Sequence, residues 1–108
     1  MSTNSSAAEL IARVRYWHPI NRPLISLLVY DAPGLYVIRR AGAPVYIGRS
    51  LTSVKRRLLR HALRFPEHEF GVLYVRDPLR CMRYEYRLIA HLRRRFRLEN
   101  RVEASICV

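Results

Sequence analysis

The sequence predicts a single α/β domain in which helices flank a three-stranded antiparallel sheet. Two observations indicate this class. A chain of 108 residues can build one compact core but not two. From residue 34 onward, short β-prone segments alternate with segments whose apolar residues recur at helical spacing. No internal repeat, low-complexity tract or long linker interrupts this order, so one core is expected.

Residues 1–33 are expected to form an N-terminal extension made of a helix and a strand. Ser6 and Glu9 have the spacing of a capping box, and the apolar residues that follow share one helical face. This helix is predicted to end near residue 17. Residues 24–30 are rich in β-prone side chains and predict a short strand before the main domain.

Residues 34–108 are expected to form the main domain, in the order β-β-α-β-α. The first two strands are predicted to be joined by a tight turn through Gly42, because glycine readily adopts a positive φ. A three-residue loop there would place Tyr36 opposite Tyr46. The predicted elements are strands at 35–39 and 45–48, a helix at about 52–65, a strand at about 70–76 and a helix at 78–97.

The charge of the chain indicates a polyanionic partner. Twenty Lys and Arg residues against eight Asp and Glu give a formal net charge of +12, and self-repulsion of this size favours a partner such as DNA or RNA. All these cations except Lys55 are arginines, whose planar group binds phosphate with two hydrogen bonds. Composition alone also fits a solvated arginine face in a protein from a GC-rich genome. The candidate nucleic-acid contacts are Arg49, Lys55, Arg56, Arg60, Arg64, Arg83 and Arg87.

The sequence carries no sign of export or membrane insertion. Its longest apolar run, residues 24–30, is far too short to span a bilayer, and the N-terminus does not read as a signal peptide. Cys81 and Cys107 have neither zinc-site spacing nor the density of a disulfide scaffold. We therefore expect a cytoplasmic protein with reduced thiols and no membrane association.

Glu85 is the most informative single position in the last predicted helix. At 100° per residue it falls inside an apolar stripe. A carboxylate removed from water needs an arginine partner, a metal ion or a proton. From this position alone, a buried Glu–Arg pair and a metal or catalytic site are equally open. The stripe contains Leu79, Met82, Tyr86, Ile89, Leu92 and Phe96.

Two further pairs of residues suit phosphoryl transfer. Arg57 and His61 stand one helical turn apart, so a cation and a titratable base are presented together. Taken alone, such a pair is more often a solvated helix face. Tyr36 and Tyr46 are expected on one face of the hairpin, where they either pack on the sheet or line a wet site.

Together these residues resemble the ordered signature of the GIY-YIG nucleases, over residues 34–101. Leu35 stands where isoleucine is usual, and Arg56 is an alternative to Arg57 that would break the four-residue step to His61. The matching positions are Gly34-Leu35-Tyr36, Tyr46-Ile47-Gly48, Arg57, His61, Glu85 and Asn100.

The resemblance implies one divalent cation, Mg²⁺ or Mn²⁺, held by Glu85 and the scissile phosphate. Arg57 would stabilise charge on the transition state. Tyr36, with Tyr46 or His61 beside it, would orient or deprotonate the attacking water, and the choice of base between Tyr36 and His61 stays open. Asn100 would orient this cluster.

The function implied is a metal-dependent DNA endonuclease for repair, recombination or mobile-element processing. No sequence-reading module is visible, so the substrate is expected to be defined by DNA structure or only weakly by sequence. Two alternatives remain: a non-catalytic nucleic-acid-binding protein that retains the fold, and a catalytic subunit of a larger complex. A homodimer is also compatible with the sequence.

Overall fold

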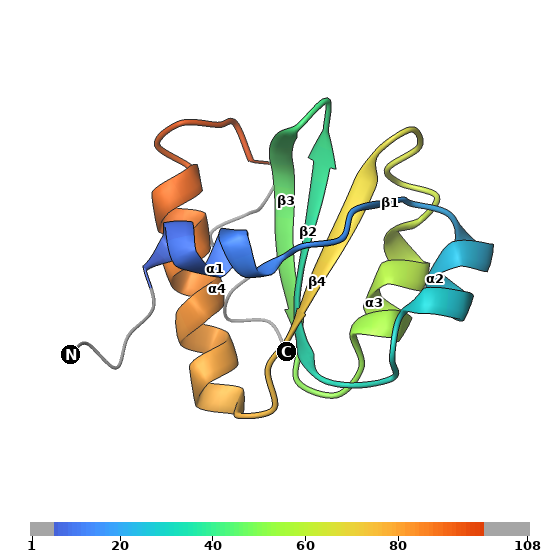
Figure 1. Cartoon of the computed structure of the whole chain (residues 1–108), viewed down its shortest axis with the longest axis horizontal. Coiled ribbons are helices and arrows are strands. Elements are labelled where there is room, and N and C mark those ends of the chain that lie inside the picture. The colour runs from blue at the N-terminus through green and yellow to red at the C-terminus, as the bar shows by residue number, and fades with distance from the viewer. Residues whose placement is uncertain (1–5, 99–108) are drawn as a thin grey trace.

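A four-stranded antiparallel sheet forms the middle layer of the computed structural model, which describes residues 6–98 (Figure 1). Its spatial order is β1-β4-β2-β3. The predicted fold class is confirmed, with one short strand added at the edge of the three expected ones. The strands are β1 (His18–Pro19), β2 (Gly34–Arg40), β3 (Ala43–Ser50) and β4 (Glu69–Tyr74).

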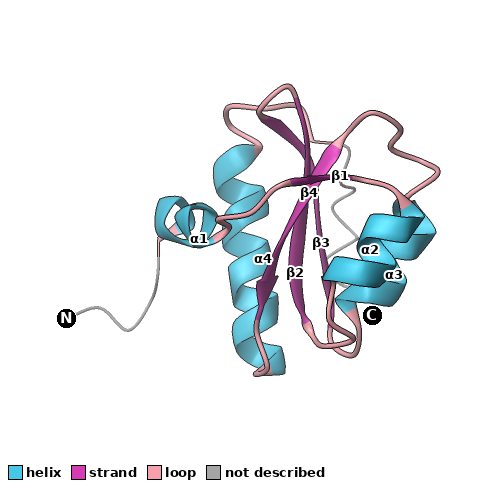
Figure 2. Cartoon of the chain, turned by 45° about the vertical axis from the view of Figure 1, so that its right-hand side comes forward, coloured by secondary structure: helices cyan, strands magenta, loops and turns pink. Residues whose placement is uncertain are grey.

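Two pairs of helices cover the two faces of the sheet (Figures 1 and 2). On one face lie α1 (Ala7–Arg13) and α4 (Pro78–Leu92), and on the other lie α2 (Arg22–Leu28) and α3 (Val54–His61). The helices predicted at about 52–65 and at 78–97 correspond to α3 and α4, and both are shorter than expected. No helix among residues 6–98 is long and apolar enough to cross a bilayer.

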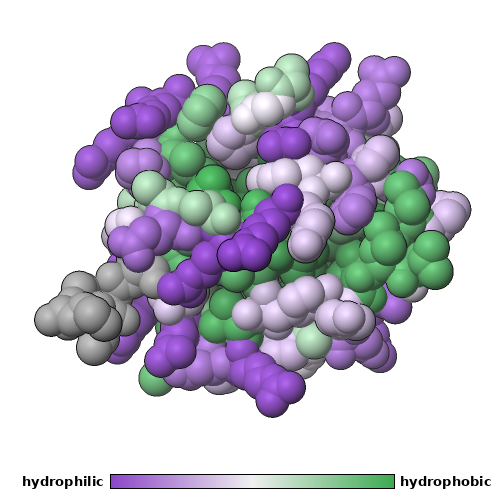
Figure 3. Space-filling view, in the orientation of Figure 1, coloured by the Kyte–Doolittle hydropathy of each residue, from purple (hydrophilic) through white to green (hydrophobic). Residues whose placement is uncertain are grey.

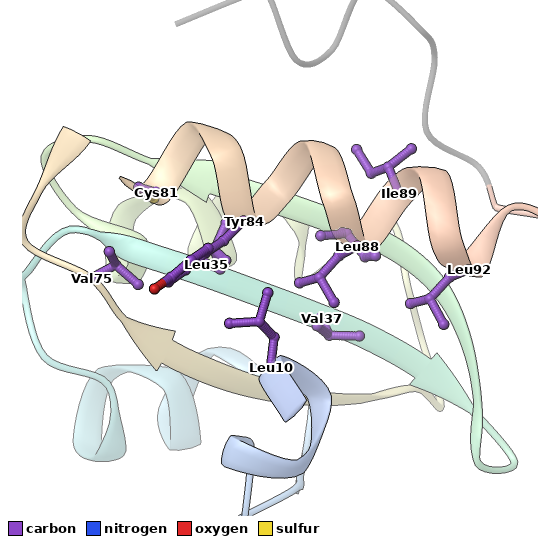
Figure 4. Packing of buried hydrophobic residues seen from close by; sticks show 10 residues of the cluster. Leu10, Leu35, Val37, Val75, Cys81, Tyr84, Leu88, Ile89 and Leu92 are labelled. Carbon is purple, nitrogen blue, oxygen red and sulfur yellow. The ribbon is translucent and has the colours of Figure 1, made fainter. Parts of the chain in front are cut away.

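Alternating side chains of β2 supply two separate cores. Leu35 faces α1 and α4, where Leu10 and Leu88 complete the first apolar cluster (Figure 4). Tyr36 and Ile38 face the opposite way, into a second cluster under α2 and α3. This alternation follows from the two-residue repeat of a strand and places Tyr36 on the α2–α3 face.

The strand predicted at residues 24–30 is wrong, because this segment forms α2. The side chain of Asn21 caps the helix by accepting a hydrogen bond from the Leu24 amide at 2.9 Å. Pro23 lies in the first turn, where backbone amides have no hydrogen-bond partner within the helix, so proline causes no loss there. Ile25 is fully buried in the second cluster. Local capping and packing together outweigh the β preference of the run.

The β2–β3 hairpin turns at Ala41 and Gly42, whose φ angles of 51° and 81° belong to a two-residue turn. The predicted three-residue loop is therefore wrong, and Tyr36 pairs with Gly48 in place of Tyr46. Tyr46 pairs with the residue two positions after Tyr36. A shift of two residues keeps both tyrosines on one face of the sheet.

The N-terminal extension packs against the main sheet. Ser6 caps helix α1 as predicted, with the Glu9 amide donating to Ser6 Oγ at 3.2 Å, and the Ser6 hydroxyl in turn donates to Glu9 Oε1 at 3.1 Å. The helix ends at Arg13, four residues earlier than expected. The chain then runs extended into β1. The guanidinium carbon of Arg39 lies 4.0 Å from the ring centre of Trp17, which anchors this segment to β2.

Candidate active site

Three aromatic side chains from three elements meet on the α2–α3 face; we call Tyr36, Tyr46 and His61 the tyrosine site. The rings of Tyr36 and Tyr46 are stacked, with 6.2 Å between centroids. The His61 ring lies 5.0 Å from Tyr46 and 5.8 Å from Tyr36, measured between centroids. Two tyrosines from the hairpin and one histidine from the end of α3 are thus brought together.

The two motif glycines are required by close approach. A methyl group at Gly48 would overlap the Tyr36 ring, with Cζ and the hydroxyl oxygen nearest and Cε1 at 2.8 Å. A methyl group at Gly34 would lie 2.5 Å from the carbonyl oxygen of Leu73 and 2.9 Å from Cα of Tyr74 on β4. Gly48 therefore makes room for the catalytic candidate Tyr36, and Gly34 lets β2 and β4 pack closely.

A cluster of hydroxyl groups connects β3 to α3. Ser50 Oγ accepts hydrogen bonds from the Ser53 amide at 2.8 Å and the Thr52 amide at 3.2 Å. Ser53 Oγ in turn caps α3 by accepting from the Arg56 amide at 3.2 Å. This arrangement fixes the start of α3, on whose first turns the basic residues lie. Sequence reasoning did not single out these hydroxyls, although serine directly before a helix is a recognisable cap signal.

A cleft of about 270 Å³ opens at this connection; we call it the basic pocket. Four arginines line it, together with the hydroxyl groups of the connection, and none of its lining residues is acidic. Arginine side chains and hydroxyls are donors that bind phosphate oxygens. The four arginines are Arg49, Arg56, Arg57 and Arg60.

Glu85 lies buried on α4, with 2% of the residue exposed. Nη1 of Arg49 donates a hydrogen bond to Oε1 of Glu85, and Arg49 is itself only 4% exposed. Arg49 was predicted to contact nucleic acid. In the structure it instead forms a buried ion pair with Glu85, and it also borders the basic pocket. Burial raises the pKa of Glu85, while the hydrogen bond and charge of Arg49, and then the charge of Arg57, oppose the rise.

The apolar stripe predicted on α4 is rotated from the observed one. Leu79 and Tyr86 are 65% and 68% exposed, and Met82 is also exposed. Glu85 lies on the predicted apolar face and also on the face that the structure buries. Apolar residues cover a wide band of this helix, so the sequence pattern alone did not determine which side faces the sheet. The residues of α4 that are buried besides Glu85 are Cys81, Tyr84, Leu88, Ile89 and Leu92, and Cys81 is a free thiol as expected.

Arg57 links the tyrosine site to Glu85 electrostatically. Burial raises the pKa of Tyr36 far above its ordinary value, Tyr46 raises it further, and the positive charge of Arg57 opposes them. Burial also lowers the pKa of His61, as do the charges of Arg64, Arg57 and Arg60. Neutral phenol and neutral imidazole are thus the favoured forms at neutral pH.

The residues present fit a magnesium or manganese ion with a single protein carboxylate. Among residues 6–98, no three His, Cys, Asp or Glu side chains gather into a metal-binding cluster. A Mg²⁺ ion commonly takes one or two carboxylates and fills its other positions with water and substrate phosphate. Glu85 can supply that carboxylate, since a carboxylate has two oxygens and Arg49 bonds one of them. The basic pocket supplies the donors for a phosphate.

The other predicted contacts lie in different places. Lys55 Nζ donates to the carbonyl oxygen of Ser26 at 3.1 Å and so joins α3 to α2. The guanidinium carbon of Arg64 lies 5.1 Å from the centre of the Phe65 ring. Arg83 and Arg87 lie on α4 beside its exposed apolar residues, away from the basic pocket. Asn100 lies outside the described residues.

Solved structures of one nuclease domain are similar to this chain. The GIY-YIG N-terminal endonuclease domain of UvrC from Thermotoga maritima, bound to magnesium as its catalytic divalent cation, matches with a TM-score of 0.54 and 24% identity. The match covers 67% of this chain and 89% of that one. A tyrosine-to-phenylalanine variant of that domain matches with a TM-score of 0.55 and 24% identity, over 67% and 88%. No protein-family model and no curated protein matches the sequence.

This likeness concerns the fold as a whole. The matched chain is covered almost completely, so the similarity extends over its whole domain and not over one motif. The order of elements also follows the β-β-α-β-α arrangement expected from the motif. The main domain of this chain therefore has the GIY-YIG fold.

Proposed function

We propose that this protein is a divalent-metal-dependent DNA endonuclease that hydrolyses phosphodiester bonds. The observation that carries the proposal is the tyrosine site together with Arg57, which lines the basic pocket and whose charge acts on both Tyr36 and Glu85. Similarity to a domain crystallised with its catalytic divalent cation supports it.

Each residue has a role that follows from its surroundings. The basic pocket binds the scissile phosphate, and Arg57 stabilises the charge that develops on it. Glu85 would hold the divalent cation, which when bound acts as a Lewis acid on the phosphate and stabilises the leaving oxygen. Arg49 keeps the carboxylate of Glu85 oriented. These roles are the ones that the GIY-YIG resemblance implies, with Arg49 added by the structure.

His61 is the better candidate for the general base. Its lowered pKa keeps the imidazole neutral at neutral pH, ready to accept a proton as the oxygen of water bonds to phosphorus. Tyr36 has a raised pKa and is 1% exposed, so its phenol remains protonated and can orient the water by hydrogen bonding. The phosphorus–oxygen bond to the leaving sugar then breaks.

The substrate is proposed to be DNA recognised mainly by its structure. The exposed arginines of α3, Arg56 and Arg60, reach phosphates, which carry no sequence information. Such a nuclease fits repair, recombination or mobile-element processing. One active site cuts one strand, so cleavage of both strands would need a dimer, two encounters or a larger complex.

A second candidate function is nucleic-acid binding without cleavage. The observation in its favour is the pair between Arg49 and Glu85, which would satisfy the buried carboxylate without a metal ion. In that case the arginines would still bind DNA or RNA.

One experiment separates these functions. Labelled single-stranded, duplex and branched DNA is incubated with the protein and Mg²⁺ or Mn²⁺, and the products are resolved on a denaturing gel. Glu85→Gln keeps the shape of the side chain and is expected to abolish cleavage while DNA binding remains. Glu67→Gln, an exposed carboxylate outside the site, is the matched control. Equal products from wild type and Glu85→Gln would overturn the proposal.

A further inference from the structure

A second cleft lies at the far edge of the sheet, between the N-terminal extension and β4; we call it the edge cleft. Its volume is about 390 Å³, within the range of about 300 to 1,000 Å³ of small-ligand pockets. Tyr16 and Tyr74 border it together with Arg13, Arg15 and His18, and its floor is apolar. In Figure 3, hydrophilic and apolar surface are intermixed across the face shown, and the largest green area lies towards the right.

Both tyrosines of the edge cleft are exposed to solvent. Tyr16 is 75% exposed, although burying an aromatic ring is favourable. Tyr74 is held in place, since its hydroxyl oxygen accepts a hydrogen bond from the Tyr30 amide at 2.9 Å. The Tyr30 ring, also exposed, lies 5.3 Å from the Tyr74 ring between centroids. Exposed aromatic rings are surfaces on which flat ligands stack.

The charge of the edge cleft selects the kind of flat ligand. Arginines and a histidine border it, and none of its lining residues is acidic. Aromatic rings interleaved with cations are the elements that bind single-stranded nucleic acid, in which bases stack on the rings and phosphates meet the cations. A paired duplex hides its base faces and offers nothing to Tyr16. The chemistry therefore fits unpaired nucleotides.

The edge cleft lies one strand away from β2, the strand that carries Tyr36. Val72, which lines the cleft, is the direct neighbour of Tyr36 in the β2–β4 register. Strand β1 pairs with β4 only at Phe70 and Glu69. Among the described residues, the rest of β4 therefore pairs with β2 on one side and has no strand on the other. A strand bound in the edge cleft thus lies within about one or two strand widths of the backbone of β2.

We propose that the edge cleft binds unpaired nucleotides of the substrate strand, stacked on Tyr16 and Tyr74. The proposed endonuclease is thereby directed to DNA that has a single-stranded segment beside the scissile bond. Only the identity of the bound strand as substrate rests on the proposed function. The binding itself needs neither the metal ion nor Glu85.

The test measures binding in the absence of cleavage. Fluorescein-labelled oligothymidylate of about eight nucleotides, a length typical of single-strand-binding sites, is titrated with the full chain in EDTA, and anisotropy is recorded. Tyr16→Ala is expected to weaken binding at least fivefold. Tyr16→Trp, which keeps a stacking ring, retains it. Tyr86→Ala removes an equally exposed tyrosine from α4 and is the matched control, with affinity unchanged.

An abasic oligomer of the same length separates stacking from charge. It carries the same phosphates without bases, so the proposal expects weak binding that Tyr16→Ala does not alter further. Equal loss in Tyr16→Ala and Tyr86→Ala, or equal binding of thymidylate and abasic strands, would overturn it. Displacement of the oligomer by an extended peptide but not by excess unlabelled thymidylate would overturn it as well. Failure of the nuclease proposal would instead appear as absent cleavage with this binding intact.

Discussion

Gly48→Ala tests whether the placement of Tyr36 controls the reaction. The added methyl group would overlap Cζ and the hydroxyl of Tyr36 and lie 2.8 Å from Cε1. Real contacts of this kind are avoided, so the ring must move by about 1 Å. Overpacking in a core costs about 1–3 kcal/mol of stability, and a misplacement of about 1 Å at a reacting centre can cost about 100-fold in rate. We therefore expect a folded but nearly inactive variant.

The assay is single-turnover cleavage of labelled DNA with Mg²⁺, beside the free energy of unfolding from urea denaturation. Gly42→Ala is the matched control, because the φ of +81° makes alanine unfavourable there while nothing lies within 4 Å of its new methyl group. It should lose about 1–2 kcal/mol of stability and keep its cleavage rate. A Gly48→Ala protein that cleaves as fast as Gly42→Ala would refute the assignment of Tyr36 to the site.

Three further results are expected. Arg49→Met should cost about 3–5 kcal/mol of unfolding free energy by leaving Glu85 unpaired, and adding Glu85→Met should recover much of it in urea denaturation without restoring cleavage. Because burial and neighbouring arginines lower the pKa of His61, cleavage should persist below pH 6.5 and fall only at lower pH, and His61→Gln should remove that acid limb from the pH–rate profile. Arg56→Ala and Arg60→Ala should each reduce the slope of log affinity against log salt by about 1, and unchanged slopes would place DNA elsewhere.

The parts of the fold that the sequence predicted are those set by short-range chemistry. The hairpin strands, the capping box at Ser6 and the proline-led α4 all occur where the local signals stand. Residues 24–30 were misjudged because their β preference is a weak bias, whereas one side-chain cap from Asn21 and one buried contact of Ile25 decide the segment. The Asn21 cap is a local signal that the sequence analysis missed, whereas the residues that bury Ile25 are not visible in the local pattern.

The sequence predicted that three aromatic residues of the candidate site lie together, but not the contacts of the basic residues around them. The motif implied that Tyr36, Tyr46 and His61 meet, and their rings do lie together. Nothing in the spacing implied that Arg49 would turn away from solvent towards Glu85. Side chains of a strand alternate between the two faces of the sheet, and on β3 Ile47 and Arg49 belong to the face covered by α4. This face contains Glu85.

The two interpretations of Glu85, an arginine pair and a metal ligand, turn out to be compatible. Burial raises the pKa of Glu85 and so favours the protonated carboxyl group, which is a poor ligand for Mg²⁺. Arg49 opposes that effect through its hydrogen bond and its charge, so the pair favours the ionised form that a metal ion needs. A neutral side chain at position 49 would therefore weaken metal binding as well as stability. The ion pair is then a means of keeping the candidate site charged, and not evidence against its use.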